Sequence, residues 1–398
     1  MKKTYILIIL FLLFFTNCKE KQSIEIIKTV EFNTGIVDIY WRFKGIYYDN
    51  DYNREVVYFS DFGKSYIKTF NLQGKILDII PLKNVVQEFA PRDIGFIYPY
   101  SIDTIFCGKH LENQIVVINH KGDIYHTINI DNIVPDSLKK LYCITQREHP
   151  YQGKNSNKII LHPMLNYQEC LLRENKTQLD LIDGHEIYFN NVFHNSPYFF
   201  ELKNIFSDKI DYDFKYRGFY EKYFIKNDVA MSNNIYFKEL NNFIFIMFNS
   251  KNLILKINHE NFELLETINI KSKYTDLGYS YTIKENLNKS ENKMKSLYQG
   301  RICELFFNEK TKQYIVIVMH AAKDKEEYDS YNEFDYRPFS VIVYDENFKN
   351  PKEYKFEANT YICRNSFMSQ EGLWLQRKPE NLTKENYGTQ TFDLIKFN

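Results

Sequence analysis

The chain has 398 residues, which is enough for one large domain or two ordinary ones. Aromatic residues make up 17% of it, with 32 Tyr and 33 Phe, and this composition favours β-strands over helices. Lys plus Arg and Asp plus Glu both number 51, and a net charge of zero argues against nucleic-acid binding, which needs a cationic surface to displace counterions from phosphates.

The N-terminal residues 1–17 are predicted to be a lipoprotein signal peptide. Lys2 and Lys3 form a basic start, and residues 5–15 are an apolar run, shorter than the roughly 20 residues of a membrane-spanning helix. Cys18 follows that run as in a lipobox, where the Cys is acylated and becomes the mature N-terminus, although the residues before it depart from the usual pattern. The alternative is an ordinary signal peptide that contains a Cys. Two or more acyl chains would anchor the protein to a membrane.

A strand-turn-strand unit recurs along the rest of the chain. Its connectors begin at Asn71, Asn119, Asn258 and Asp345, residue types whose side chains cap their own turns. Three of the four connectors end with Gly or Asn, which tolerate positive φ, and Asp345 starts the weakest copy. A further strand precedes each hairpin, so the unit is a meander of three or four antiparallel strands. The strands are predicted at 55–59, 66–70, 75–80, 103–107, 115–118, 123–128, 243–248, 253–257, 263–268, 314–318 and 341–344.

Two less regular units bring the predicted total to six. One is expected at 158–190, and the other at the C-terminus, where 372–375 and 392–397 read as strands. Repeated small meanders are typical of propeller blades, because one blade cannot bury both of its faces alone. Residues 24–32 resemble an outermost strand without its blade, and the C-terminal blade lacks one. Pairing the two would close the ring and protect an exposed edge.

The predicted fold is therefore all-β: a single domain over 18–398, a β-propeller of six antiparallel four-stranded blades. Long loops are expected at 131–157, 271–300 and 321–338, the second with a short helix near 286–297. The cysteines after Cys18 are widely spread and show no zinc or redox spacing, so most are predicted to be buried small hydrophobes, although one disulfide is allowed. They are Cys107, Cys143, Cys170, Cys303 and Cys363.

Several of these features together resemble one known family. The relaxed lipobox, the hairpin repeats, the closing strand at 371–375 and the stretches 298–303 and 314–316 look like a family of bacterial lipoproteins, domain of unknown function 4221. The resemblance implies a TolB-like six-bladed propeller at the cell envelope. It implies no established catalytic residues, so no active site is carried over.

No motif in the sequence carries a recognisable reaction. Residues 63–65 end like a P-loop, but the glycine that the motif requires is replaced by Tyr58 and no helix is expected to follow. The acidic stretch 321–338 could offer oxygen ligands to calcium, yet it lacks the turn glycines of calcium loops, and a solvated loop is favoured. His120, His126 and His259 are expected to be solvated turn residues. No catalytic residue, metal site or cofactor is predicted.

Loops and inner-strand ends near the propeller axis are the expected location of any ligand site. Arginine beside aromatic residues suits sugars, carboxylates or peptides, although an ordinary surface ion pair is the favoured interpretation of each arginine. The candidate ligand-binding residues are Trp41, Arg42, Arg92, Arg301, His320, Arg337 and Arg364.

Three functions are compatible with these features. The first is a non-catalytic binding or scaffold propeller, tethered to a bacterial membrane (the outer membrane being expected) and facing the periplasm or the exterior, whose ligand is a small molecule, a glycan or a protein. The second is a propeller enzyme, a hydrolase or lyase acting on a glycan or peptide, which a cluster of carboxylates near the axis would favour. The third is a component of a larger envelope complex, which an exposed apolar patch would favour.

Overall fold

The computed structural model of the protein describes the greater part of the predicted mature chain. The described residues are 23–35, 42–61, 66–89, 94–109, 113–134, 136, 142–144, 158–161, 163–165, 199–207, 209–215, 235–248, 252–278, 298–330, 336–379 and 388–398. Cys18 and the predicted signal peptide lie outside these residues, as do the helix predicted near 286–297 and most of the unit predicted at 158–190.

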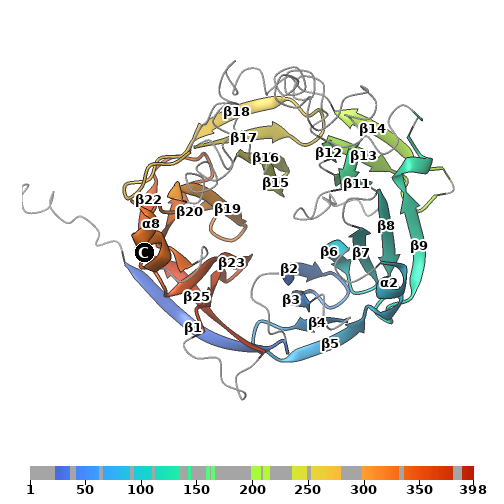
Figure 1. Cartoon of the computed structure of the whole chain (residues 1–398), viewed down its shortest axis with the longest axis horizontal. Helices are drawn as coiled ribbons and strands as arrows, with labels where there is room; N and C mark the ends of the chain where they lie inside the picture. Colours follow the sequence, from blue (N-terminus) through green and yellow to red (C-terminus); the bar gives the residue numbers. More distant parts are fainter. Residues whose placement is uncertain are drawn as a thin grey trace, which may run out of the picture.

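Five antiparallel four-stranded sheets lie around a common axis in the described part of the chain (Figure 1). Four of them are meanders whose first strand lies nearest the axis and whose fourth lies on the rim. Their strands are β2 (Arg42–Asp49), β3 (Arg54–Asp61), β4 (Tyr66–Phe70) and β5 (Ile76–Pro81); β6 (Ile94–Ser101), β7 (Thr104–Lys109), β8 (Gln114–Ile118) and β9 (Ile124–Asn129); β15 (Ile235–Leu240), β16 (Phe243–Phe248), β17 (Leu253–Asn258) and β18 (Leu264–Asn269); β19 (Arg301–Asn308), β20 (Gln313–Met319), β21 (Phe339–Tyr344) and β22 (Lys352–Phe356). The predicted all-β propeller is therefore confirmed.

The fifth sheet joins the two ends of the chain. It contains β23 (Tyr361–Ser369), β24 (Gly372–Arg377), β25 (Thr389–Phe397) and, outermost, β1 (Ile24–Asn33). β1 and β25 are antiparallel, in a register that runs from Ile24 opposite Phe397 to Asn33 opposite Thr389. The predicted pairing of residues 24–32 with the last strand is present.

The sector predicted as a blade at 158–190 is built differently from the other five. Its described strands form a two-stranded sheet of β10 (Tyr142–Ile144) and β12 (Pro163–Leu165), and a three-stranded sheet of β11 (Lys158–Leu161), β13 (Phe199–Lys203) and β14 (Asp211–Lys215). Figure 1 places these strands between the β6–β9 and β15–β18 sheets. Five of the six predicted four-stranded blades are thus found among the described residues.

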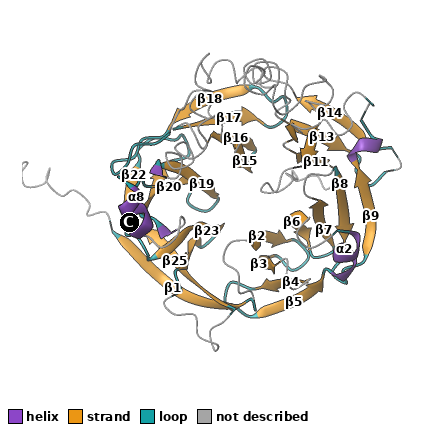
Figure 2. Ribbon diagram, in the orientation of Figure 1, coloured by secondary structure: helices purple, strands orange, loops and turns teal. Residues whose placement is uncertain are grey.

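Helices play a small part in the described structure (Figure 2). The helical segments are α2 (Lys83–Glu88), the 3-10 helix η2 (Ile130–Asn132) and α8 (Lys325–Ser330). The acidic stretch at 321–338 was predicted to be a loop, and α8 lies inside it. Asp324 Oδ1 accepts from Glu327 N at 2.8 Å, so an aspartate caps the first turn of this helix.

The middle strands of each sheet are apolar on both faces because each sheet packs against two neighbours. On β20, Val316 and Val318 belong to a buried cluster shared with Phe245 of β16, on one side. The alternating residues Ile317 and Met319 belong to another cluster, shared with the β23–β25 sheet on the other side. Successive side chains of a strand point to opposite faces of the sheet, so consecutive residues of β20 pack into the cores on its two sides. This explains why a single meander could not fold alone.

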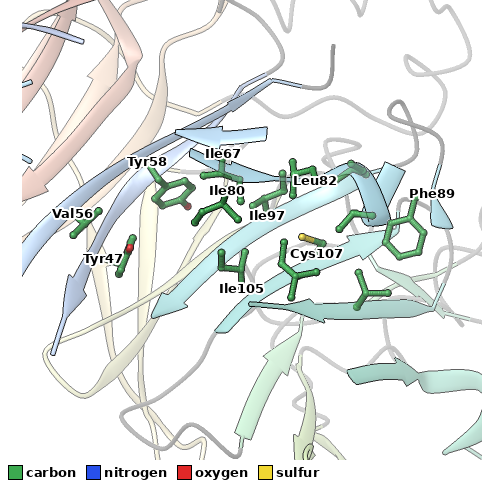
Figure 3. Close-up of a cluster of buried hydrophobic side chains, with 14 residues drawn as sticks. Tyr47, Val56, Tyr58, Ile67, Ile80, Leu82, Phe89, Ile97, Ile105 and Cys107 are labelled. Carbon is green, nitrogen blue, oxygen red and sulfur yellow. The ribbon is translucent and has the colours of Figure 1, made fainter. Parts of the chain in front are cut away.

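Figure 3 shows one of these inter-sheet cores, between the β2–β5 and β6–β9 sheets. Tyr58 and Ile67 come from the first sheet, and Ile97, Ile105 and Cys107 from the second. All five side chains are buried. Cys107, Cys303 and Cys363 are buried free thiols, as predicted, and burial raises the pKa of the Cys107 thiol.

The first two connectors form the predicted capped turns. Asn71 Oδ1 accepts from Gln73 N at 3.0 Å and from Lys75 N at 2.9 Å, and Gly74 has φ +81°. Asn119 Oδ1 accepts in the same way from the backbone of Lys121 and Asp123, at 2.9 and 3.0 Å. A side-chain acceptor replaces missing backbone partners, so an Asn at the start of the connector specifies the turn.

The third connector differs from the prediction at the left-handed position, and the fourth, for which no residue was predicted there, resembles it. That position is occupied by Phe262 (φ +58°) and Phe348 (φ +54°) rather than by Gly or Asn, and Asn261 is not in this conformation. Both phenylalanines are buried, and the ring of Phe348 stacks on Tyr314 with 4.1 Å between centroids. A left-handed non-glycine residue costs about 1–3 kcal/mol, and burial of a Phe side chain contributes about as much. The buried ring offsets the strained backbone.

Gly122 allows one sheet to pack against the next. It has φ +78°, and a Cβ there would lie 2.0 Å from the carbonyl oxygen of Pro81 on the neighbouring sheet. We expect Gly122→Ala to lower the free energy of unfolding by about 2 kcal/mol or more, because both the backbone conformation and the contact oppose a side chain. Urea unfolding of the full chain measures this loss. Lys121→Ala, in the same turn, is the control and should change stability by less than about 0.5 kcal/mol.

Candidate functional site

Four of the seven candidate ligand-binding residues have described side chains: Arg301, His320, Arg337 and Arg364. Trp41 and Arg92 lie outside the described residues. Arg42 is the first residue of β2, next to the axis, and its side chain is not among those described.

Three of the four gather at one end of the β19–β22 sheet. Arg301 begins β19 and lies opposite Met319 at the end of β20. His320 follows Met319 directly, and Arg337 lies two residues before β21 begins. Antiparallel strands bring the start of one strand to the end of its neighbour, so residues distant in sequence meet at one edge.

Arg337 is completely buried and binds backbone oxygens. Its Nη2 group lies 3.1 Å from Tyr298 O and 3.2 Å from Gln299 O, and it also donates to His320 O. Carbonyl oxygens carry partial negative charge, so several of them together stabilise the Nη2 end of this buried guanidinium. Arg337 therefore fixes the segment before β19 against the end of β20 and acts as a structural residue.

His320 is also buried and engaged. Its Nε2 lies 2.7 Å from Ser340 Oγ, and Tyr274 stacks on its ring with 6.0 Å between centroids. Burial, with smaller contributions from the positive charges of Lys355 and Arg337, lowers the pKa of His320 to about 4. The imidazole is consequently neutral at physiological pH and forms a fixed polar contact with Ser340.

The segment that follows β18 covers this end of the sheet. Thr275 Oγ1 accepts from Ala321 N at 2.8 Å. Glu353, on β22, accepts from Ser272 Oγ and from Lys273 N, both at 2.6 Å. These bonds hold the segment that leaves β18 against the neighbouring β19–β22 sheet.

Arg364 lies in an irregular part of β23, the innermost strand of its sheet. Ile362 is opposite Gln376 and Ser366 is opposite Leu375, so three residues of β23 face no partner in the ladder. Bulges of this kind re-aim side chains and are frequent beside binding sites. Arg364 is half-buried, and this bulge makes it the best-placed candidate of the four.

A buried polar chain that the sequence reasoning missed passes through the same bulge. Asn365 Nδ2 donates to Gln376 Oε1 at 2.7 Å, and Gln376 Nε2 donates to Gln390 Oε1. Lys44 of β2, on the neighbouring sheet, donates to Asn365 Oδ1. This series of hydrogen bonds runs from β2 across β23 and β24 to β25, so polar contacts link the first and last sheets.

A second missed feature is a buried carboxyl group at the end of β15. The side chain of Glu239 is only 10% exposed, and its Oε2 lies 3.7 Å from Nε2 of His259, in the connector after β17. His259 was predicted to be solvated, but its side chain is only 21% exposed. Burial raises the pKa of Glu239 to about 8, and this group in turn contributes, after burial, to raising the pKa of Tyr98 to about 12.

Glu239 should make the stability of the protein pH-dependent. The folded chain holds the Glu239 proton more tightly than the unfolded chain does, so the contribution of Glu239 to stability should fall as the pH rises from about 4.5 to about 8 and then level off. The lowered pKa of His320 has the opposite effect, but only up to about pH 6.5, so the fall should be visible above that pH. We expect Glu239→Gln to remove the fall between pH 6.5 and 8 and to raise the free energy of unfolding by about 2 kcal/mol at pH 8. Urea unfolding across this range tests this, and Glu260→Gln, at an exposed position, is the control. Equal slopes for the wild type and Glu239→Gln in this range would contradict the assignment.

In the described part of the chain, no group of three or more His, Cys, Asp or Glu side chains is arranged to hold a metal ion. None of the helices described there is long and apolar enough to cross a bilayer.

Comparison with known proteins finds similarity in fold only. No family model matches the chain, and no curated protein matches it. Among solved structures, a member of the DUF4221 family from Bacteroides vulgatus has a TM-score of 0.67 at 15% identity, over 95% of this chain and 98% of that one. A luciferin-regenerating enzyme (TM-score 0.43, 8% identity, 94% and 95% covered) and the calcium-binding protein regucalcin from Agrobacterium tumefaciens (0.41, 11%, 92% of each chain) are more distant. The DUF4221 structure supports the propeller fold of this chain and, at 15% identity, nothing further.

Proposed function

We propose that the protein is an exported lipoprotein, anchored to a membrane of the cell envelope through acylated Cys18, whose six-bladed propeller is a non-catalytic binding or scaffold module. The basic start, the short apolar run and the Cys that follows it support the anchor. The DUF4221 structure supports the comparison with that family at the level of fold.

The sector at 142–215 is proposed to be the sixth blade. Its strands occupy the interval between the β6–β9 and β15–β18 sheets in Figure 1. Leu202 of β13 and Ile205 belong to the buried cluster that contains Phe96 and Phe106 of the β6–β9 sheet. A sheet that shares its core with a neighbour in this way has the packing of a blade. With a sixth blade in place, the pairing of β1 with β25 closes the ring.

The observation that favours binding is the type of polar contact between neighbouring inner strands. Lys44 of β2 meets Asn365 of β23, and Lys238 of β15 forms an ion pair with Glu304 of β19. Amide and ion-pair contacts recognise polar ligands and fix their orientation. In those two contacts Lys44 donates to an amide and Lys238 pairs with a carboxylate, and the neutral His320 and its partner Ser340 are both buried. The proposed ligand is a glycan, a peptide or another polar molecule that reaches the axis.

The anchor is tested by producing the full chain in a bacterium that processes lipoproteins. Intact-mass spectrometry should show a mature chain that begins at Cys18 and carries acyl groups, and the protein should sediment with membranes. Cys18→Ala should lack the acyl mass and should no longer be retained by membranes through lipid. An unmodified mature N-terminus at another residue would refute the anchor and leave the propeller unaffected.

Binding is tested with the detergent-solubilised chain on glycan and peptide arrays. We expect a ligand to be retained unchanged, with Arg364→Ala weakening its binding about tenfold, because a guanidinium near the axis would be a directional contact for polar groups. Lys312→Ala, at an exposed turn position, should have no effect on affinity. Mass spectrometry of the bound material separates the two functions: a cleaved or eliminated product would establish the hydrolase or lyase alternative.

A further inference from the structure

The outer strand β1 begins with three exposed apolar side chains. Ile24, Ile26 and Ile27 are 38%, 48% and 48% exposed. Farther along the same strand, Val30 and Phe32 are buried in the core between the first and last sheets. Both parts of β1 therefore carry apolar side chains, but only those of the second part, Val30 and Phe32, are buried against other sheets.

A β-bulge explains why adjacent isoleucines both reach the surface. Ile26 lies opposite Ile395 and Lys28 lies opposite Leu394, so Ile27 is an extra residue in the ladder. In a regular strand, consecutive side chains point to opposite faces. The extra residue breaks this alternation between the buried and the exposed part of the strand.

The three isoleucines lie a short distance along the chain from Cys18, the proposed site of acylation. Asn398 N donates to Ser23 O at 3.1 Å, so the fold holds the chain from Ser23 onward. Six steps separate the α-carbons of Cys18 and Ile24, and a fully extended chain spans about 20 Å over that number. An acyl anchor on Cys18 consequently keeps the beginning of β1 within about 20 Å of the bilayer surface.

Charge does not oppose this placement. Glu25 lies 4.0 Å from Lys396, and Lys28 lies 2.6 Å from Glu371. The four charges around the isoleucines sum to zero, so apolar contact rather than attraction to anionic headgroups is expected to dominate. β1 is also an edge strand with unpaired backbone groups, which limits its depth to the wet interfacial layer.

We propose that Ile24, Ile26 and Ile27 form a membrane-contacting edge that docks the rim of the propeller on the lipid bilayer, an inference that rests on the proposed acylation of Cys18. β1 lies on the outside of the ring of sheets (Figure 1). Docking through this rim leaves both ends of the propeller axis away from the bilayer, where a polar ligand can reach the inner strands.

The test uses the full acylated chain in vesicles of phosphatidylethanolamine and phosphatidylglycerol. Ile26→Cys carries an environment-sensitive fluorophore, and Ile79→Cys, at a 50% exposed position on the outer strand β5, is the matched control. Quenchers attached to lipid acyl chains should quench the probe at 26 about threefold more than the probe at 79, with little change when salt is raised. The unsubstituted chain gives the labelling background from the native cysteines.

The outcomes separate this inference from the proposed anchor. If the chain is acylated and floats with vesicles, but both probes are equally open to aqueous iodide, the docked edge is refuted and the anchor stands. If mass spectrometry finds no acyl group at Cys18, both fail. Protection of the probe at 26 from iodide without quenching by lipid, increasing with protein density, would show that a second copy covers the edge strand and would overturn bilayer docking.

Discussion

Replacing Phe32 with alanine is expected to lower the free energy of unfolding by about 3–5 kcal/mol. Phe32 is fully buried, and its ring centroid lies 5.5 Å from those of Phe59 and Phe70 and 5.6 Å from that of Phe392. Phe59 and Phe70 belong to the first sheet, and Phe392 belongs to the last. The substitution would open a cavity where the two ends of the chain meet, and aromatic edge-to-face contacts would be lost with it.

Urea unfolding of the detergent-solubilised chain measures this loss. Ile26→Ala is the control, because it lies on the same strand at an exposed position and should change stability by less than about 1 kcal/mol. If Phe32→Ala cost no more than the control, β1 would not be a structural part of the fifth sheet. The pairing of β1 with β25 would then be a peripheral contact.

The parts of the fold that could be predicted are those specified by local chemistry. The Asn at the start of a connector bonds to backbone groups two and four residues later, as Asn71 and Asn119 do, so a short stretch of sequence contains the whole turn. The closing strand was predictable for a different reason. Residues 24–32 are apolar and strand-like but have no hairpin partner nearby, and an unpaired strand needs an edge elsewhere.

The connectors with Phe262 and Phe348 show where local reasoning is insufficient. A positive φ was expected only at Gly or Asn, since other residues pay a steric cost. Both phenylalanines are buried, and Phe348 belongs to the core between the β15–β18 and β19–β22 sheets, where it stacks on Tyr314 of β20. The energy that permits the turn comes from residues distant in sequence, so the turn residues alone could not reveal it.

The contacts of the candidate site residues could not be predicted from the sequence. Arg301, His320 and Arg337 do gather at one end of the β19–β22 sheet, because strand ends meet there. The partners of Arg337 are backbone oxygens, which every residue possesses and no motif marks. The contact between Glu239 and His259 was not predicted. It depends on how the end of β15 lies beside the connector after β17 in the folded protein, and neither the residue types nor their spacing in the sequence indicates it.

Arg337 provides the second large expected effect, because its guanidinium is fully buried among carbonyl oxygens. We expect Arg337→Met to lower the free energy of unfolding by about 3 kcal/mol, since Tyr298 O, Gln299 O and His320 O would all lose the buried guanidinium as their donor. Arg337→Lys keeps the charge but not the planar fork, so it should recover only part of the loss. Lys325→Met, an exposed cation in an ion pair with Asp329, should cost less than about 0.5 kcal/mol.

The same variants distinguish a structural Arg337 from a ligand-binding one. If the residue fixes the segment before β19, amide hydrogen exchange at residues 298–301 should speed up in Arg337→Met while the exchange of β24 remains close to that of the wild type. Once a ligand is identified, its affinity for Arg337→Met measured below the unfolding transition should follow the fraction of folded protein. If Arg337→Met kept wild-type stability and local exchange rates but lost ligand binding, Arg337 would be a ligand-binding residue and not a structural one. Its guanidinium would then have to turn away from Tyr298 and Gln299 and face the ligand.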